Sequence, residues 1–437
     1  MLTTSFGIFY TYQISQERNK AQLQAQKAEA VTTFLTDLIE ASAPSNAQGD
    51  TITVREFLDQ GFNEVQKLDK SPLVKAEILN TMGHTFRSLS ETQKASTLLN
   101  QALTILEKHG QNSIKMARSY NIYGIIQRDL GNYDTAKTAL KKSIDLYRSN
   151  AQENSGSFSK ALRDLAYVER LKGNYEHASS LVREALAIER TLYEAPDVRI
   201  AETLYVLASV LRYQNKFEEA IDVQKQSLKM VRAITDKAHP GIANNLVNLA
   251  HLYDLQNKIQ KARKYYQQAL SMSKDLHGDT HRRLANIHSS LSSVYLYEGK
   301  LDSAVLHFKK ARKIQRRIDP HSKNMTTILD NGAKVYARKK QFSKADTMLK
   351  KDKAILQELF RPNHPRLVDW KISKAKIQQQ QGNLSTAEEL YSEVLQVRKK
   401  RYKRTENPVQ EVLHMLIDVL EASGQQAKAD SLSQQLP

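Results

Sequence analysis

The 437-residue chain contains no cysteine, and glycine and proline are scarce, at 15 and 9 residues. The absence of cysteine excludes disulfide bonds, thiolate metal sites and a cysteine nucleophile. So few helix-breaking residues over this length favour a helical protein. A membrane-spanning run of about 20 apolar residues is also missing, because the apolar start, MLTTSFGIFYTYQI, extends over only 14 residues. This start has no basic leader and no small-residue cleavage site, so it is a poor signal peptide.

Acidic residues are scarce in one part of the chain. Residues 300–404 hold 27 Lys and Arg against 10 Asp and Glu, a net charge of +17, while the formal net charge of the whole chain is +18. The most basic stretch, RKKRYKR (398–404), lies at the end of this block. A polyanionic partner would therefore favour the C-terminal third.

A short motif recurs along the chain at a nearly constant interval. LGNYDTA (130–136) returns as KGNYEHA (172–178), QNKFEEA (214–220) and further copies, each ending in alanine. Successive alanines are 41 or 42 residues apart, which indicates an array of structural repeats. These marker alanines are Ala95, Ala136, Ala178, Ala220, Ala262, Ala304, Ala345, Ala387 and Ala429.

Each marker lies between two amphipathic runs, such as NLVNLAHLYDL (245–255) and KARKYYQQALSM (261–272). Apolar residues at three- and four-residue spacing predict two helices, and a Gly/Asn turn between them provides the left-handed position that ends the first helix. One helix pair cannot bury its apolar stripe alone. The sequence therefore predicts an all-α, right-handed superhelical solenoid of about nine antiparallel helix pairs. A second small residue lies seven after the marker in six repeats: Ala102, Ser143, Ala185, Ser227, Ala269 and Ala311.

The pattern resembles the tetratricopeptide repeat over about residues 70–437. The 42-residue period and the copy HPGIANNLVNLAHLYDLQNKIQKARKYYQQALSM (239–272) resemble the kinesin-light-chain variety. HEAT and armadillo repeats have similar periods but lack the Gly/Asn–x–aromatic–x–x–Ala turn. The domain prediction is an apolar stub (1–15), an N-terminal helical extension (16–69) and the repeat solenoid (70–437).

The front end carries a second resemblance. AEAVTTFLTDLIEASAP (28–44), TITVREFLDQG (51–61) and SPLVKAEILNTMGHTFRSL (71–89) resemble the segment after the membrane helix in bacterial serine/threonine kinases with a C-terminal repeat array. The chain contains no Gly-rich phosphate loop with a strand lysine, no His-Arg-Asp loop and no Asp-Phe-Gly. The kinase activity of that family therefore does not carry over, and no enzymatic role is expected.

The compartment depends on where the native chain starts. If Met1 is the native start, the expected compartment is the cytoplasm. If the chain is a truncated form of the kinase family, the resemblance implies a membrane tether at the N-terminus and repeats beyond the inner membrane. The oligomeric state is open.

Two features resemble sites but favour structural roles. HGDTH (277–281) spaces two histidines like zinc ligands, but the glutamate base is missing and Gly278 weakens a helix there. The stretch coincides with the loop between repeats, like the histidines of KAHP (237–240) and PNHP (362–365). Trp370, the only tryptophan, lies in a first helix and is expected to pack. No metal or cofactor is expected.

The repeat geometry predicts a partner-binding surface. In the family, the first helix of each pair lines the concave face, with inward positions about 15, 11 and 8 residues before the marker. Over the first four repeats these positions are rich in Arg, Asn and Tyr, which suit an extended, acidic peptide. We therefore expect a scaffold or sensor that binds a protein or peptide. The candidate contacts are Arg87, Asn121, Arg128, Arg163, Tyr167, Arg170, Tyr205 and Arg212.

Two alternatives stay open. An arginine in the last turn of a helix is favoured by the helix dipole by about 0.3–1 kcal/mol, which alone could select the arginine column. The basic C-terminal third (300–404) could instead bind nucleic acid or another polyanion, although few aromatic residues are interleaved for stacking. Its excess cations lie on second helices, which face outward, where a solvated face is the simpler interpretation. The candidate polyanion contacts are Lys309, Lys310, Lys313, Arg317, Lys400, Arg401, Lys403 and Arg404.

Overall fold

The computed structural model describes residues 18, 54–68, 71–89, 91–109, 113–361, 364–401 and 407–436. Within these residues all regular secondary structure is α-helical, in 19 helices. None of the helices in this described part is both long and apolar enough to cross a lipid bilayer. The predicted all-α repeat fold is thereby confirmed. The predicted stub 1–15 and most of the predicted extension lie outside the described residues.

The chain forms two compact units, residues 1–220 and 221–437, with the boundary inside α10 (Phe217–Ile234). Unit 1 contains α2 (Val54–Gln66), α3 (Pro72–Ser88), α4 (Thr92–His109), α5 (Ile114–Asp129), α6 (Tyr133–Ser149), α7 (Gly156–Leu171), α8 (Tyr175–Leu192) and α9 (Val198–Tyr213). Unit 2 contains α11 (Pro240–Leu255), α12 (Ile259–His277), α13 (Arg282–Tyr297), α14 (Leu301–Ile318), α15 (Lys323–Arg338), α16 (Phe342–Leu359), α17 (Pro365–Gln380), α18 (Leu384–Arg401), α19 (Asn407–Ala422) and α20 (Gln426–Ser433).

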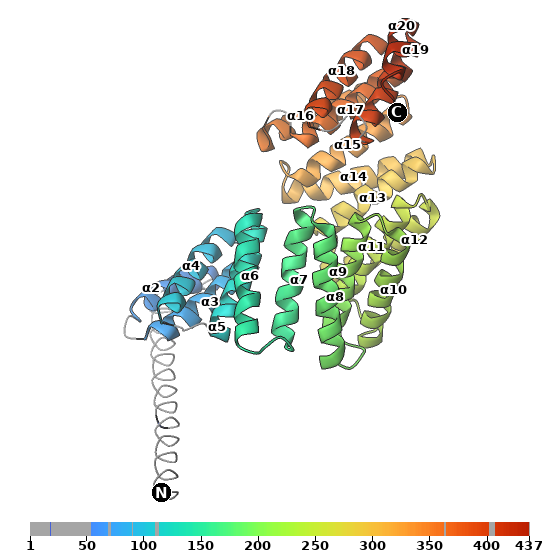
Figure 1. Cartoon of the computed structure of the whole chain (residues 1–437). Coiled ribbons are helices and arrows are strands. Elements are labelled where there is room, and N and C mark those ends of the chain that lie inside the picture. The colour runs from blue at the N-terminus through green and yellow to red at the C-terminus, as the bar shows by residue number, and fades with distance from the viewer. Residues whose placement is uncertain are drawn as a thin grey trace, which may run out of the picture. The chain divides into compact units, whose positions relative to one another are not determined.

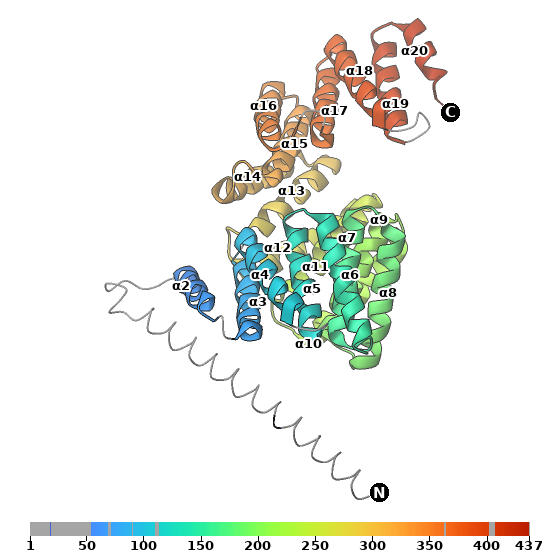
Figure 2. The ribbon, with the colours of Figure 1, turned by 60° about the vertical axis from the view of Figure 1, so that its left-hand side comes forward.

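Small side chains hold the two helices of each repeat together. All nine marker alanines and all six of the second small residues have 0% of their surface exposed. Pairs such as α3 with α4 and α13 with α14 pack along their lengths, as Figures 1 and 2 show for each unit. At one second position, Ser143 Oγ donates a hydrogen bond to the Ala117 carbonyl oxygen at 2.7 Å. The paired helices thus approach each other closely at these small residues.

The turn inside each repeat ends the first helix in the predicted way. In eight repeats one residue of the turn has a positive φ, between 56° and 85°. After α5, for example, Gly131 has the positive φ. The N–H of the next residue, Asn132, donates to the Gln127 carbonyl at 2.9 Å. This six-to-one bond is the hydrogen bond of a Schellman ending. The positive-φ residues are Gly131, Gly173, Asn215, Asn257, Gly299, Lys340, Gly382 and Gly424.

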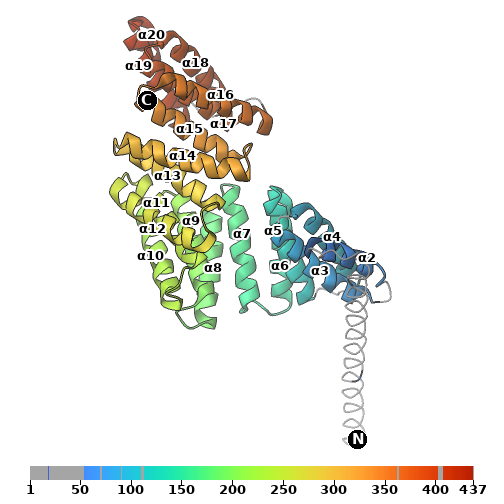
Figure 3. The same cartoon turned by 180° about the vertical axis from the view of Figure 1, so that it is seen from behind.

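First helices of successive repeats contact one another. In unit 1 these contacts join α3 to α5, α5 to α7 and α7 to α9, and in unit 2 they join α13 to α15 and α15 to α17. Figure 3 shows the same stacking order from behind. Equivalent residues of successive first helices therefore lie on neighbouring helices and can form a continuous surface.

The seventh repeat departs from the small-residue rule at Asp352. This residue lies seven after Ala345, where six other repeats have alanine or serine, and it is only 2% exposed. Its Oδ1 has no hydrogen-bond partner. Burial raises the pKa of Asp352 to about 7, and the nearby Asp330 raises it further, against the opposing charges of Arg366 and Lys334. Above about pH 7 the carboxyl group is therefore ionised in a packed helix interface, where Arg366 and Lys334 compensate its charge only partly.

We expect Asp352→Ala to stabilise the protein, and more at pH 8 than at pH 4. Because the folded pKa of about 7 lies above the ordinary value of 3.8, the folded state loses stability as pH rises between these values. The difference between the two pH values should be roughly 2–4 kcal/mol in the free energy of unfolding. Urea unfolding at both pH values measures it. Asp352→Asn, which keeps the shape without titrating, is the control, and an equal gain for Asp352→Ala at both pH values would contradict the assignment.

We expect Lys340→Gly to stabilise the seventh repeat by about 0.5–1 kcal/mol. Lys340 has φ 57° and an exposed side chain, and a non-glycine residue costs roughly 1–2 kcal/mol in this region, partly offset by the flexibility that glycine adds to the unfolded chain. Thermal unfolding measures the gain. Gly382→Ala, at the same position of the next repeat, should shift the melting temperature downward. A loss of stability in Lys340→Gly would show that the lysine side chain contributes there.

Candidate partner-binding surface

Four arginines occupy the last turns of the first helices in unit 1. Arg87, Arg128, Arg170 and Arg212 are one repeat apart and end α3, α5, α7 and α9, respectively. Among the described residues they meet a single carboxylate. Asp129 Oδ2 lies 2.7 Å from Arg87 Nε, and its Oδ1 lies 2.7 Å from an Arg128 amino group. The column therefore retains an excess of positive charge.

Tyrosine rings connect the arginines from one repeat to the next. The guanidinium carbon of Arg128 lies 4.7 Å from the ring centre of Tyr167, and that of Arg170 lies 4.4 Å from the same ring. Tyr213 stands in the same way between Arg170, at 5.0 Å, and Arg212, at 4.6 Å. We call these five residues the Arg–Tyr stack. Each such contact contributes about 0.5–1 kcal/mol where exposed and about 2 where desolvated.

The tyrosine rings contact the flat faces of the guanidinium groups, and the edges of these groups can still form hydrogen bonds. The in-plane N–H groups are the donors that bind a carboxylate in a fork. Arg170 is 8% exposed, and its buried Nε has no hydrogen-bond partner. Within the described residues, the ion pairs of this column involve Arg87 and Arg128, not Arg170 or Arg212. Within the described residues, Arg170 and Arg212 therefore have oriented donors and no carboxylate partner.

Tyr213 is the functional candidate that the sequence reasoning missed. It lies seven residues before Ala220, next to the arginine column, and 41% of it is exposed. Its ring also stacks on Tyr175, with 5.6 Å between centroids and 18° between planes. The available signal was the Arg–Tyr dipeptide in the last turn of α9. Both interpretations of the column remain compatible with this geometry, because a last-turn arginine meets the helix dipole wherever its side chain packs.

Asn121 is used mainly within the fold. Its amide nitrogen donates to Asp164 Oδ2 at 3.1 Å, and 5% of the residue is exposed. One repeat earlier, Asn80 donates from the same position to Ser119 Oγ at 2.6 Å. The asparagine column thus joins neighbouring first helices. A hydrogen bond from Asn121 to a partner backbone stays a prediction.

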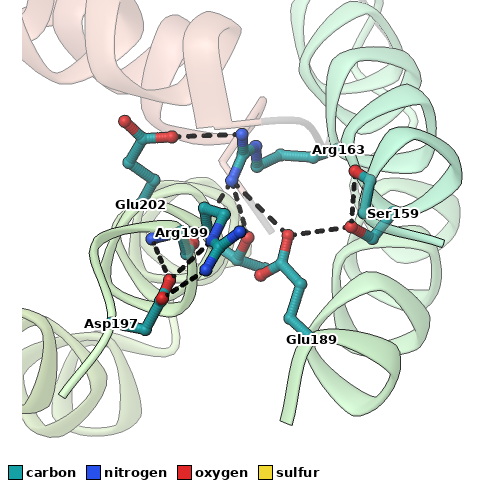
Figure 4. A network of polar contacts seen from close by, with 8 residues as sticks. Ser159, Arg163, Glu189, Asp197, Arg199 and Glu202 are labelled. Carbon is teal, nitrogen blue, oxygen red and sulfur yellow. Dashed lines mark hydrogen bonds and ion pairs between the residues drawn. The ribbon is translucent and has the colours of Figure 1, made fainter. Parts of the chain in front are cut away.

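Arg163 lies at the centre of a polar network that joins α7, α8 and α9 (Figure 4). It donates to Thr203 Oγ1 at 2.9 Å and to the Arg199 carbonyl at 3.3 Å, and it pairs with Glu202 at 3.1 Å. Only 12% of its side chain is exposed. Arg163 therefore cross-links two repeats, and the carboxylate of Glu202, which is 59% exposed, faces it from the next first helix.

Glu189 lies behind this arginine in the same network. Its Oε1 accepts from Ser159 Oγ at 3.0 Å and lies 3.7 Å from Arg163. Burial raises the pKa of Glu189, because the hydrogen bonds and the arginine only partly offset the loss of solvent. Figure 4 also shows Asp197, whose pKa is lowered mainly by its hydrogen bonds from Arg199. Tyr205, the remaining candidate, is half-buried on α9 and makes a contact within the chain.

The basic candidates of the C-terminal third lie on two helices of unit 2. Lys309, Lys310, Lys313 and Arg317 are exposed on α14, and Lys400 is exposed near the end of α18. Arg401 is the last residue of α18, while Lys403 and Arg404 lie outside the described residues. The α14 residues line two neighbouring cavities.

The histidines between repeats cap helices. His239, His281 and His364 each accept a backbone N–H at the start of a first helix, through Nδ1 at 3.0, 3.2 and 3.2 Å. The loop interpretation of HGDTH is therefore confirmed. In the described part of the chain no cluster of three or more His, Asp or Glu side chains could hold a metal ion. Trp370 packs, donating from Nε1 to the Leu349 carbonyl at 3.0 Å.

Comparison with solved structures finds the same fold. A Rap protein complexed with competence and sporulation factor has a TM-score of 0.55 and 15% identity, with 86% of this chain and 98% of that chain covered. Aspartyl phosphate phosphatase F from Bacillus subtilis has a TM-score of 0.54 and 14% identity, with 85% and 94% covered. BtubC (BKLC) from P. vanneervenii has a TM-score of 0.44 and 22% identity, with 55% and 94% covered. Comparison with curated protein sequences gives no match.

The sequence itself matches one protein family. The match to the family described as Tetratricopeptide repeat covers residues 74–149, 157–233, 201–275 and 241–317, which together make up more than half of the chain. The matched ranges run from α3 to α14 and include the residues of the Arg–Tyr stack. Together with the marker alanines, the turns and the stacked helix pairs, this match shows that the chain belongs to the tetratricopeptide-repeat family.

Proposed function

We propose that this tetratricopeptide-repeat protein is an interaction scaffold whose unit 1 binds an extended acidic segment of a partner protein across the Arg–Tyr stack. The observation that carries the proposal is the imbalance of charge in the arginine column. Of four guanidinium groups, one per repeat, only those of Arg87 and Arg128 pair with a carboxylate within the described residues, and it is the same one, Asp129. A partner carboxylate would complete the hydrogen bonding of donors that the fold already orients.

The repeat spacing favours an extended ligand over a compact one. Repeat-equivalent arginines lie on contacting first helices, so the donors form a row that crosses several helices. An extended segment with spaced acidic side chains matches such a row. A Rap protein of this fold was solved in complex with competence and sporulation factor, and we extend the general capacity for partner binding, without its ligand, to this chain.

Orientation before binding lowers the entropic cost of recognition. Arg128 and Arg170 are held against Tyr167, and Arg212 is held against Tyr213, so little side-chain freedom remains to be lost. A flexible lysine at these positions would keep the charge but lose the planar stacking and the fork of donors. The proposal therefore depends on arginine as a residue type, in addition to positive charge.

The resemblance of residues 28–89 to membrane-bound kinases supports a finer proposal. We infer that the scaffold is the sensing or docking part of a kinase signalling system whose catalytic domain is encoded elsewhere. Co-purification of the chain with a kinase encoded beside it would support this inference. Recovery of partners without any kinase would count against it while leaving the scaffold proposal intact.

The charge-reversal variant Arg87→Glu/Arg212→Glu should weaken binding of an acidic peptide by about tenfold or more. Both residues are accessible enough to change without disturbing the buried Arg170. The probe is a fluorescent decapeptide alternating Glu and Gly, measured by anisotropy, with a Lys–Gly peptide as the negative partner. Arg190→Glu on α8, an exposed arginine on a second helix, is the control for net charge. It is compared with each single variant, Arg87→Glu and Arg212→Glu, because all three change the net charge by the same amount.

Two results would contradict the proposal. The first is equal weakening by the Arg190→Glu control, which would show that only total charge matters. The second is unchanged affinity in the double variant when circular dichroism shows it folded. Arg212→Lys should give an intermediate affinity, because it keeps the charge and loses the planar donor pair.

A further inference from the structure

The exposed face of α14 concentrates cations that have no acidic partners. Lys309, Arg312, Lys313, Arg316 and Arg317 follow the spacing i, i+3, i+4, i+7 and i+8, so they share one side of the helix and line one cavity of about 530 Å³. Like charges four residues apart on a helix are destabilising. Elsewhere in unit 2, basic residues such as Lys339, Lys371 and Lys374 do pair with carboxylates. Within the described residues, no ion pair involves Lys309, Lys310, Lys313, Arg316 or Arg317.

A second cavity, next to this face, is built like an anion site. It has a volume of about 340 Å³ and lies between α14, α13 and the end of α12. Its floor is apolar, made by Leu270, Leu284 and Ile314. Its polar lining residues are Lys274, Asp279, Thr280, His288, Lys310, Lys313 and Arg317.

The charges around this cavity do not balance. Asp279 is its only acidic lining residue, and it lies 3.2 Å from Lys274 with 76% of its side chain exposed. Because Asp279 pairs with Lys274, no acidic residue that lines the cavity pairs with Lys310, Lys313 or Arg317. All three come from one helix, with Lys313 and Arg317 four residues apart, so their mutual repulsion is built into the sequence.

His288 adds a neutral polar group to the same wall. Its Nδ1 lies 2.9 Å from Nδ1 of His307, and one ring must donate this hydrogen bond to the other. Burial, with Lys310 nearby, lowers the pKa of both histidines to about 4, so both rings are neutral at pH 7. If His307 donates, His288 carries its proton on Nε2 and can donate to a ligand in the cavity.

We propose that this cavity of unit 2 binds a phosphate monoester through Lys310, Lys313 and Arg317. A monoester carries a charge of about −1.5 to −2 at pH 7 and three acceptor oxygens, which matches two ammonium groups and one guanidinium. A single carboxylate or a phosphodiester carries only one negative charge and would leave the cluster largely unbalanced. Thr280 supplies a hydroxyl donor, and the apolar floor accommodates the carbon atoms attached to the phosphate.

Two adjacent lysines provide a matched test of this site. Lys310 lines the proposed cavity, whereas Lys309 lines only the neighbouring one. Calorimetry of the full chain with phosphoserine and with inorganic phosphate should show saturable binding. Lys310→Gln should weaken it by about tenfold, and Lys309→Gln by less than twofold. Both side chains are exposed, so both variants should keep the parent melting temperature in chloride buffer.

The ligand series separates the sources of the phosphoryl group. Preference for phosphoserine over inorganic phosphate would support the monoester site and assign it to a modified side chain. Four results overturn it: the reverse order of affinity, which would assign the site to a free anion, no saturable binding up to millimolar phosphate, equal effects of the two lysine variants, or tighter binding of a single-stranded oligonucleotide with a steep salt dependence. The site lies in unit 2 and does not use the Arg–Tyr stack, so it stands or fails independently of the proposed scaffold function.

Discussion

The close approach of two helices over small side chains is the constraint on which the rest of this structure depends. A marker alanine and a second small residue are fully buried between the helices in six repeats, and small side chains at these positions permit the close approach of the pair. The approach then fixes which faces are left for the next repeat. First helices contact first helices within each unit, and every column of equivalent side chains follows from that arrangement.

The columns explain why one fold supports two chemically different surfaces. In unit 1 tyrosine rings lie between Arg128, Arg170 and Arg212 and restrict their orientation, and Asp129 compensates part of the charge of Arg87 and Arg128. On α14 the cations lie on the exposed face of a second helix, where no carboxylate of the described residues pairs with Lys310 or Lys313. The first surface therefore has cations of restricted orientation, and the second has exposed cations on a single helix face.

The buried polar residues of the repeats differ in how well hydrogen bonds and opposite charges compensate their loss of solvent. Ser143 Oγ donates to a carbonyl, and Ser159 and Arg163 compensate Glu189 Oε1 only partly, since the pKa of Glu189 is raised and its Oε2 has no hydrogen-bond partner within the described residues. Within the described residues, Asp352 Oδ1 has no hydrogen-bond partner, and burial raises the pKa of this group because its charged form is destabilised. The seventh repeat combines this carboxyl group with a lysine at the left-handed turn position. Two local rules are thus broken in the same repeat.

The sequence by itself determined the helix pairs, their number and their turns, because these depend on local spacing that recurs every 41 or 42 residues. Gly131 and Asn215 identify the left-handed turn positions, since few other residues adopt them at low cost. The arginine column was also visible from the repeat interval. Only the tertiary structure decided what those arginines touch. Tyr213 meets Arg170 from the next repeat, and Lys310 shares a cavity with residues of α12 and α13. Such contacts join residues some 40 positions apart, and their geometry depends on packing between repeats, which no spacing within one repeat specifies.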